Sequence, residues 1–135
     1  MAIFSYPLRV YIEDTDAGGI VYYVNYLKFM ERARTEMMRS LSYDKNSIFA
    51  DELMFVVHSV KADYIAPAKL DDALEVTANV LKVGAAYILF EQKVLLDGET
   101  LCCGEVKIVC VDRITMKPRA LSKAMQQVLK NTIKA

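Results

Sequence analysis

The sequence predicts an α+β fold in which an antiparallel sheet of about five strands curls around one long α-helix. Two observations support this prediction. An amphipathic pattern of about five helical turns begins near Tyr22, and four strand-like segments follow one another between residues 55 and 111. Another strand-like segment precedes the helix. Short turns join the later strands, which favours hairpin pairing within one sheet.

Length and composition limit the kind of protein that this chain can be. Its 135 residues are 54% hydrophobic, enough for one domain over residues 1–135 with its own core. The 17 basic and 17 acidic residues cancel, so the basic face that nucleic-acid binding needs is not indicated. No apolar run is long enough for a membrane span, and the N-terminal residues lack a signal-peptide pattern. We therefore expect a cytoplasmic protein.

The cysteines and the histidine give little support for a disulfide, a metal site or thiol catalysis. Cys102, Cys103 and Cys110 fall on one strand-like segment, where adjacent side chains point to opposite faces. The sequence has no CxxC motif, and its only histidine is His58, in another strand-like segment. We expect no metal and no cofactor, cysteines that pack in the sheet, and a structural or surface role for His58.

The first elements are a strand, a turn and the long helix. Residues 3–12 have the aromatic and branched composition of a strand, in which Pro7 favours an edge position or a bulge. The helix is predicted from Tyr22 to a boundary near residues 42–44. Its buried stripe is predicted to hold Tyr22, Tyr26, Phe29, Met30, Ala33, Met37 and Leu41. Its polar face, solvated or at an interface, is predicted to hold Lys28, Glu31, Arg32, Arg34, Glu36 and Arg39.

The rest of the chain reads as a short helix, four strands and a last helix. The short helix would be capped by Asp44 and extend through about Leu53. Strands are predicted over residues 55–65, 72–82, 87–96 and 100–111, with an Asp-Gly hairpin turn at 97–98. In the strand over 55–65, unbroken alternation would place Val56, His58, Val60, Ala62 and Tyr64 on one face. A basic loop over 113–119 leads to a helix that Ser122 can cap.

The turn between the first strand and the long helix allows two interpretations. In the structural one, Asp14, Thr15 or Asp16 caps the helix N-terminus, and the glycines supply the turn geometry. In the functional one, amides at the start of the helix polarise a substrate carbonyl while a carboxylate attacks it or activates water. The glycines would then let the substrate approach the backbone.

A family resemblance favours the functional interpretation. Residues 11–26 read YIEDTDAGGIVYYVNY, and residues 31–36 read ERARTE. Together with residues 55–57, 64–72, 109–112 and 116–121, they resemble acyl-CoA thioesterases of the hotdog fold. More narrowly, they are similar to the YbgC type, which is associated with the Tol-Pal cell-envelope system and related to 4-hydroxybenzoyl-CoA thioesterase. The resemblance covers nearly the whole chain.

The resemblance implies a site as well as an activity, the hydrolysis of acyl-CoA to a free acid and CoA. It places the catalytic aspartate, as nucleophile or general base, at Asp16 and the oxyanion donor at the backbone amide of Tyr23. Gly18, Gly19 and Tyr22 would contact the substrate. Many YbgC-type sequences have histidine where this chain has Tyr23, whereas the hydroxybenzoyl-CoA enzymes have tyrosine, so the acyl preference stays open.

Further expectations concern coenzyme A and assembly. The phosphates of CoA require lysine or arginine, and strand ends and loops offer Lys82, Lys117 and Arg119. The resemblance implies a homo-oligomer, a dimer or tetramer, with active sites at the subunit interface. An exposed sheet edge would also favour pairing between copies.

Two alternatives to an acyl-CoA thioesterase remain. One is a non-catalytic acyl-binding or scaffold protein of the envelope machinery, since a fold does not determine a function. The other is a thioesterase that acts on acyl-carrier protein. A hydratase is less favoured, because His58 lies outside the acidic motif. The presence of Asp16 favours an enzyme, because a binding protein needs no carboxylate beside a thioester carbonyl.

Overall fold

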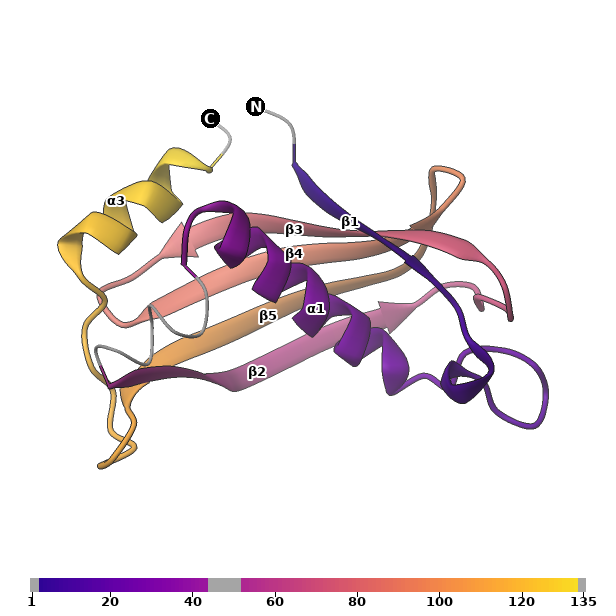
Figure 1. The fold of residues 1–135 in the computed structure, drawn as a ribbon, viewed down its shortest axis with the longest axis horizontal. Helices are drawn as coiled ribbons and strands as arrows, with labels where there is room; N and C mark the ends of the chain where they lie inside the picture. Colours follow the sequence, from indigo (N-terminus) through magenta and orange to yellow (C-terminus); the bar gives the residue numbers. More distant parts are fainter. Residues whose placement is uncertain (1–2, 44–51, 134–135) are drawn as a thin grey trace.

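The fold is a five-stranded antiparallel sheet with a long helix across one face, as the sequence predicts. The computed structural model describes residues 3–43 and 52–133. The strands are β1 (Phe4–Arg9), β2 (Leu53–Tyr64), β3 (Ala73–Val83), β4 (Tyr87–Leu96) and β5 (Glu99–Asp112). The helical segments are η1 (Ile12–Asp14), α1 (Asn25–Ser40) and α3 (Lys123–Asn131). The strand order is β1-β3-β4-β5-β2, and α1 lies against this sheet (Figure 1). None of the helices in the described ranges is long and apolar enough to cross a membrane.

The core lies between α1 and the sheet. In β3 the residues that face the helix are at most 2% exposed, and on α1 the residues that meet them are not exposed at all. Those residues are Leu74, Val76, Ala78 and Val80 on β3, and Phe29, Met30 and Ala33 on α1. The alternation of period two on the strand and the helical spacing on α1 therefore meet in one apolar layer.

The start of α1 differs from the prediction. The first helical residue is Asn25, three positions after Tyr22, and the Asn25 amide donates to the carbonyl of Tyr22 at 2.8 Å. The chain thus makes a turn over these four residues before the helix begins. Tyr22 is consequently 48% exposed instead of lying in the buried stripe.

The polar face of α1 also contains an error of prediction. Arg34 was expected on the solvated or interface-facing side, but only 8% of it is exposed. Its guanidinium donates to the side chain of Gln92 on β4 at 2.9 Å, beneath the helix. A polar partner within the core therefore draws this arginine inward.

β2 is longer and less regular than predicted. It begins at Leu53, which was expected at the end of a short helix, while residues 44–51 lie outside the described part of the chain. The register with β5 shifts between Val57 and Ser59, so His58 is an extra residue in a bulge. Because Val57 pairs with Ile108 and Val60 with Val106, these two valines share a face. The predicted face that combined Val56, His58 and Val60 is therefore wrong.

The sheet has two free edges and a helix packed near one end. Pro7 lies in the edge strand β1, as predicted, opposite Glu75. β2 forms the other edge. α3 contacts β3, and the predicted cap is confirmed because the Ser122 hydroxyl accepts from the Met125 amide at 3.1 Å. The strands β3, β4 and β5 match their predicted ranges within one residue at each end.

Candidate active site

The acidic turn forms a tight hairpin that leads into α1. The Asp16 amide donates to the carbonyl of Ile20 at 2.9 Å, and Thr15 pairs with Val21. Gly19 has a φ of +79°, a conformation that favours glycine. The return strand is also bridged from Ile20 to Lys69, so the segment after β2 supports the hairpin. In Figure 1 this loop lies at the end of the sheet where α1 begins.

Asp14 has a structural role in this turn. Only 8% of the residue is exposed, and its carboxylate accepts from the Tyr11 amide at 2.8 Å. Its carbonyl accepts from the Tyr22 amide at 3.0 Å and from the Asn25 side chain at 2.8 Å. Asp14 therefore connects β1, the hairpin and the start of α1.

Asp16 has the opposite environment, since it is exposed on the hairpin. One carboxylate oxygen, Oδ1, accepts from the Gly18 amide at 2.8 Å. A Cβ at Gly18 would lie only 3.2 Å from that oxygen, so a side chain there would crowd the carboxylate. Within the described part of the chain, Oδ2 takes part in no hydrogen bond. The loop thus orients the carboxylate through one oxygen and leaves the other available for chemistry.

The amide of Tyr23 is a free donor beside this hairpin. Tyr23 lies two residues before the first residue of α1, in the turn closed by Tyr22 and Asn25. No hydrogen bond among the described residues uses the amide of Tyr23 or Val24. Both positions are central in the turn, where amides have no internal acceptor. The positive end of the helix dipole adds to their attraction for a developing oxyanion.

Four tyrosine rings form a cluster that includes Tyr22 and Tyr23 of this turn. The ring of Tyr23 lies 5.1 Å from that of Tyr22 and 5.7 Å from that of Tyr64, measured between centroids. Tyr64 in turn lies 5.7 Å from Tyr26, whose hydroxyl accepts from the Ala68 amide at 2.9 Å. Burial raises the pKa of Tyr26 and of Tyr64, so both phenols are neutral at physiological pH.

Sequence reasoning assigned no site role to Tyr64 or Tyr26. The signal for Tyr64 was present, since the family resemblance includes residues 64–72. Tyr26 was predicted only as a member of the buried stripe, where it indeed lies at 3% exposed. Its hydroxyl contact with Ala68 joins residues 42 positions apart, which no local pattern predicts.

The cysteines and the histidine do not form a competing site. Burial, with added contributions from the neighbouring Cys103 and Asp63, raises the pKa of the Cys102 thiol to about 11. A thiol with this pKa is a poor nucleophile at neutral pH. All three cysteines are free, and His58 is exposed in the β2 bulge. The described residues contain no cluster of three or more metal-ligating side chains.

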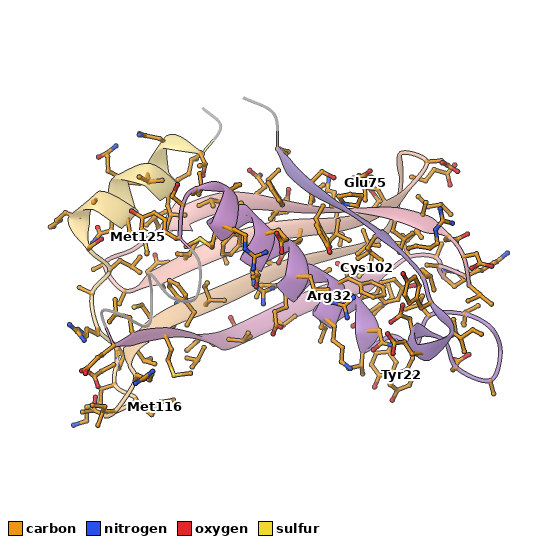
Figure 2. The ribbon with its side chains drawn as sticks, in the orientation of Figure 1. Tyr22, Arg32, Glu75, Cys102, Met116 and Met125 are labelled. Atoms are coloured by element: carbon orange, nitrogen blue, oxygen red, sulfur yellow. The ribbon has the colours of Figure 1, made fainter. Side chains whose placement is uncertain are left out.

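The structure separates Asp16 from the cations predicted for the CoA phosphates: Lys82, Lys117 and Arg119. The hairpin lies beside the start of β3, whereas Lys82 lies near its end, about 30 Å away at the usual strand rise. The amide of Arg119 donates to Cys110, near the end of β5. Figure 2 shows Tyr22 and Met116, the neighbour of Lys117, at opposite ends of the sheet. Within one chain these cations do not adjoin the carboxylate.

Comparison with known proteins establishes the family. Residues 10–129 match the sequence model of the thioesterase-like superfamily. The acyl-CoA thioester hydrolase YbgC of Escherichia coli O6:H1 is 44% identical over 124 residues, which cover 91% of this chain and 92% of that protein. The acyl-CoA thioesterase YbgC of Haemophilus influenzae is 47% identical over 124 residues, 91% of each chain. The chain belongs to the YbgC family of acyl-CoA thioesterases.

The fold of this YbgC-family chain is the hotdog fold, as the resemblance implied. The DHNA-CoA thioesterase from Staphylococcus aureus superposes with a TM-score of 0.90, covering 97% of this chain and 91% of that one at 18% identity. The five residues predicted for catalysis and substrate contact come from one hairpin and the turn that follows it. They are Asp16, Gly18, Gly19, Tyr22 and Tyr23, and all of them are exposed.

Proposed function

We propose that this chain hydrolyses acyl-CoA thioesters with Asp16 as the attacking or water-activating carboxylate and the Tyr23 amide as the oxyanion donor. The observation that carries the proposal is the pairing of these two groups. Asp16 is oriented by the Gly18 amide with one oxygen free, and the Tyr23 amide has no acceptor among the described residues. Family membership supplies the reaction class.

A thioester is a suitable substrate for so small a set of groups. Sulfur overlaps poorly with the carbonyl, and the thiolate leaves readily, so no Ser-His-Asp triad is required. An ionised carboxylate can attack the carbonyl to form an anhydride or remove a proton from water, while the amide binds the oxyanion. Gly18, Gly19 and Tyr22 then form the surface that the thioester approaches. The choice between nucleophile and general base stays open within this proposal.

The test is thiol release from short, medium, long and aromatic acyl-CoAs. We expect the wild type to hydrolyse acyl-CoA. We expect kcat to fall by roughly 10³-fold or more in Asp16→Ala and Asp16→Asn, since both substitutions remove the negatively charged carboxylate. Glu13→Gln is the matched control, because it removes an exposed carboxylate from the same loop. Circular dichroism establishes that each variant is folded.

Three results would contradict the proposal. Full activity of Asp16→Asn would remove this carboxylate from the chemistry. No thiol release from any acyl-CoA by the wild type would favour the non-catalytic acyl-binding protein, and release from acyl-carrier protein alone would favour the carrier-protein thioesterase. A cytoplasmic location and an association with the Tol-Pal system remain part of the proposal, and cell fractionation and co-purification test them.

A further inference from the structure

A groove between α1 and the sheet begins beside the proposed oxyanion donor. Its volume is about 210 Å³, and Val24, the residue after Tyr23, lines one end. Leu27 and Met30 of α1 form one wall. The sheet contributes Val57, Val60 and Val106, which share a face because of the bulge at His58. An acyl chain whose carbonyl lies at the Tyr23 amide would have this apolar groove directly beside it.

The groove contains charged side chains at a regular helical spacing. Lys28, Glu31 and Arg34 follow one another at intervals of three residues and all line it. Of these three charged residues, Arg34 lies furthest along the helix from Tyr23 and is the most deeply buried, at 8% exposed. The helix rises about 15 Å from Val24 to Arg34, and side chains on a helix lean back toward its N-terminus. The guanidinium therefore lies less than that distance from the start of the groove.

Arg34 is held by a neutral network and not by a carboxylate. Its guanidinium donates to Gln92 at 2.9 Å, and the Gln92 amide donates to the carbonyls of Met30 and Thr77 at 2.9 and 3.1 Å. Within the described ranges no ion pair includes Arg34. Burial lowers the pKa of Arg34, and the Glu31 charge partly offsets this effect. Arginine nevertheless stays charged in proteins.

Arg34 has donors that Gln92 does not use. A guanidinium has five N–H donors, and one nitrogen is used by Gln92. No buried side-chain nitrogen or oxygen of the described residues lacks a partner, so the unbonded nitrogens of Arg34 retain access to solvent. Arg34 also lines the groove, so we infer that these nitrogens can meet a ligand bound there. A cation in mostly apolar surroundings is costly unless an anion or water meets it.

We propose that this groove holds the acyl chain and that Arg34 selects acyl groups with a carboxylate at their far end, the half-thioesters of dicarboxylic acids. The apolar walls take the methylene groups, and the guanidinium forms charge-assisted hydrogen bonds with the terminal carboxylate. A plain alkyl end would instead replace water at the cation without providing an acceptor. This inference takes the position of the thioester carbonyl from the proposed hydrolysis. The recognition of the terminal carboxylate by Arg34 can nevertheless be measured by binding alone.

The first test compares chains of equal length with and without the terminal carboxylate. The substrates are adipoyl-CoA with hexanoyl-CoA and suberoyl-CoA with octanoyl-CoA, and the readout is the ratio of kcat/KM within each pair. We expect the wild type to favour the carboxylated member roughly tenfold or more, Arg34→Met to lose that preference, and Arg34→Lys to keep part of it. Arg32→Met is the matched control, because Arg32 lies over the Phe29 ring and does not line the groove.

A second test separates this inference from hydrolysis. Calorimetric binding of the thioether analogues of adipoyl-CoA and hexanoyl-CoA requires no turnover, so an Arg34-dependent preference would stand even if no thiol were released. In a further variant, Val60→Phe, a larger side chain fills the groove from the sheet edge, where Val60 is 41% exposed. We expect kcat/KM to fall far more for the longer pairs than for acetyl-CoA, whose acyl group is too short to reach along the groove. This difference provides evidence even if Arg34→Met does not fold.

Three outcomes would overturn the proposal. Equal binding of the two analogues by the wild type would show that the far end of the chain is not recognised. If folded Arg34→Met keeps the preference for carboxylated substrates, the role of Arg34 is limited to its contact with Gln92, which holds α1 against β4. A change of oligomeric mass in Arg34→Met without a change of preference would assign the groove to contact between copies of the chain.

Discussion

At the scale of single residues, Asp14 and Asp16 show how position in a turn separates two identical side chains. Asp14 ends the short helical turn η1 and is covered, so its carboxylate is used by the Tyr11 amide. Asp16 follows two residues later, where the backbone pairs with Ile20 and the side chain projects into solvent. Burial and hydrogen bonding make Asp14 a structural group, whereas one carboxylate oxygen of Asp16 has no hydrogen-bond partner in the ranges 3–43 and 52–133.

The oxyanion role of the Tyr23 amide can be tested by removing its N–H. Tyr23→Pro deletes this donor at the second residue of a turn, a position that accepts proline. We expect kcat to fall by about 10² or more, the usual effect of losing one such donor. Tyr23→Ala is the control, because it removes the ring and keeps the amide. The rates are measured by thiol release, with thermal unfolding of each variant alongside.

The kcat of Tyr23→Ala shows whether the ring or the amide of Tyr23 is responsible for a loss of activity. If Tyr23→Ala loses as much activity as Tyr23→Pro while both remain folded, the ring and not the amide carries the effect. If the proline variant is as active as the wild type, another donor binds the oxyanion. The second result would direct attention to the Val24 amide, which is equally free among the described residues.

Residue roles that depend on distant partners could not be predicted from the sequence. Asp16 and Tyr23 were predicted because the family motif is local and continuous. Arg34 was misplaced, since its burial depends on Gln92, which lies 58 residues further along the chain. A charged residue on a helix is predicted to be exposed unless its hydrogen-bond acceptor is known. The position of Arg34 in the groove is therefore known only from the tertiary structure.

At the scale of elements, local patterns predicted the regular strands and the last helix well. β3 and β4 have clear alternation bounded by turn residues, and the Ser122 cap has a simple side-chain signature. The bulge in β2 and the turn before α1 were missed. The bulge depends on the register between β2 and β5. The turn depends on the hydrogen bond from the Tyr22 amide to the Asp14 carbonyl.

The close contact between α1 and β5 depends on the absence of a side chain at Gly104. A Cβ there would lie 3.2 Å from the Met30 Cε and 3.3 Å from the carbonyl of Lys61. The Lys61 backbone cannot rotate away as a side chain can, so we expect Gly104→Ala to lower the free energy of unfolding by about 1 kcal/mol or more. Urea denaturation followed by circular dichroism measures this loss.

The matched control is Cys103→Ala on the same strand. Cys103 is partly exposed, whereas Gly104 is buried under Met30. We expect the control to change the free energy of unfolding less than Gly104→Ala does. If Gly104→Ala instead stabilises the protein, the Met30 side chain moves aside without strain. The main effect of the substitution is then the lower conformational entropy of the unfolded chain.

At the scale of the whole molecule, β1 and β2 each have one side that pairs with no other strand of the described residues, and the two differ in their capacity for association. β1 has six residues and includes Pro7, which cannot donate a backbone hydrogen bond. β2 has twelve residues, and Val57 and Tyr64 on it are 51% and 45% exposed. Pairing of β2 with β2 of a second copy is therefore the better way to cover a free edge.

Such pairing bears on the CoA phosphates. In one chain, Lys82, Lys117 and Arg119 lie at the end of the sheet opposite to Asp16, as Figure 2 shows for the region of Met116. Either a second copy brings one of these cations toward the hairpin, or other residues bind the phosphates. The proposed homo-oligomer thus determines whether the site is complete within a single chain.

The assembly prediction is that the wild type forms dimers or tetramers through β2. Its native mass should be a multiple of 15.3 kDa in light scattering coupled to size exclusion. Val57→Lys places a charge on this edge, and charged edge residues oppose strand pairing, so the variant should shift toward the monomer. Ile12→Lys is the control, because Ile12 is 75% exposed and lies on η1, outside both edge strands. A monomeric wild type would exclude a shared active site, and an unchanged mass for Val57→Lys would move the interface away from this edge.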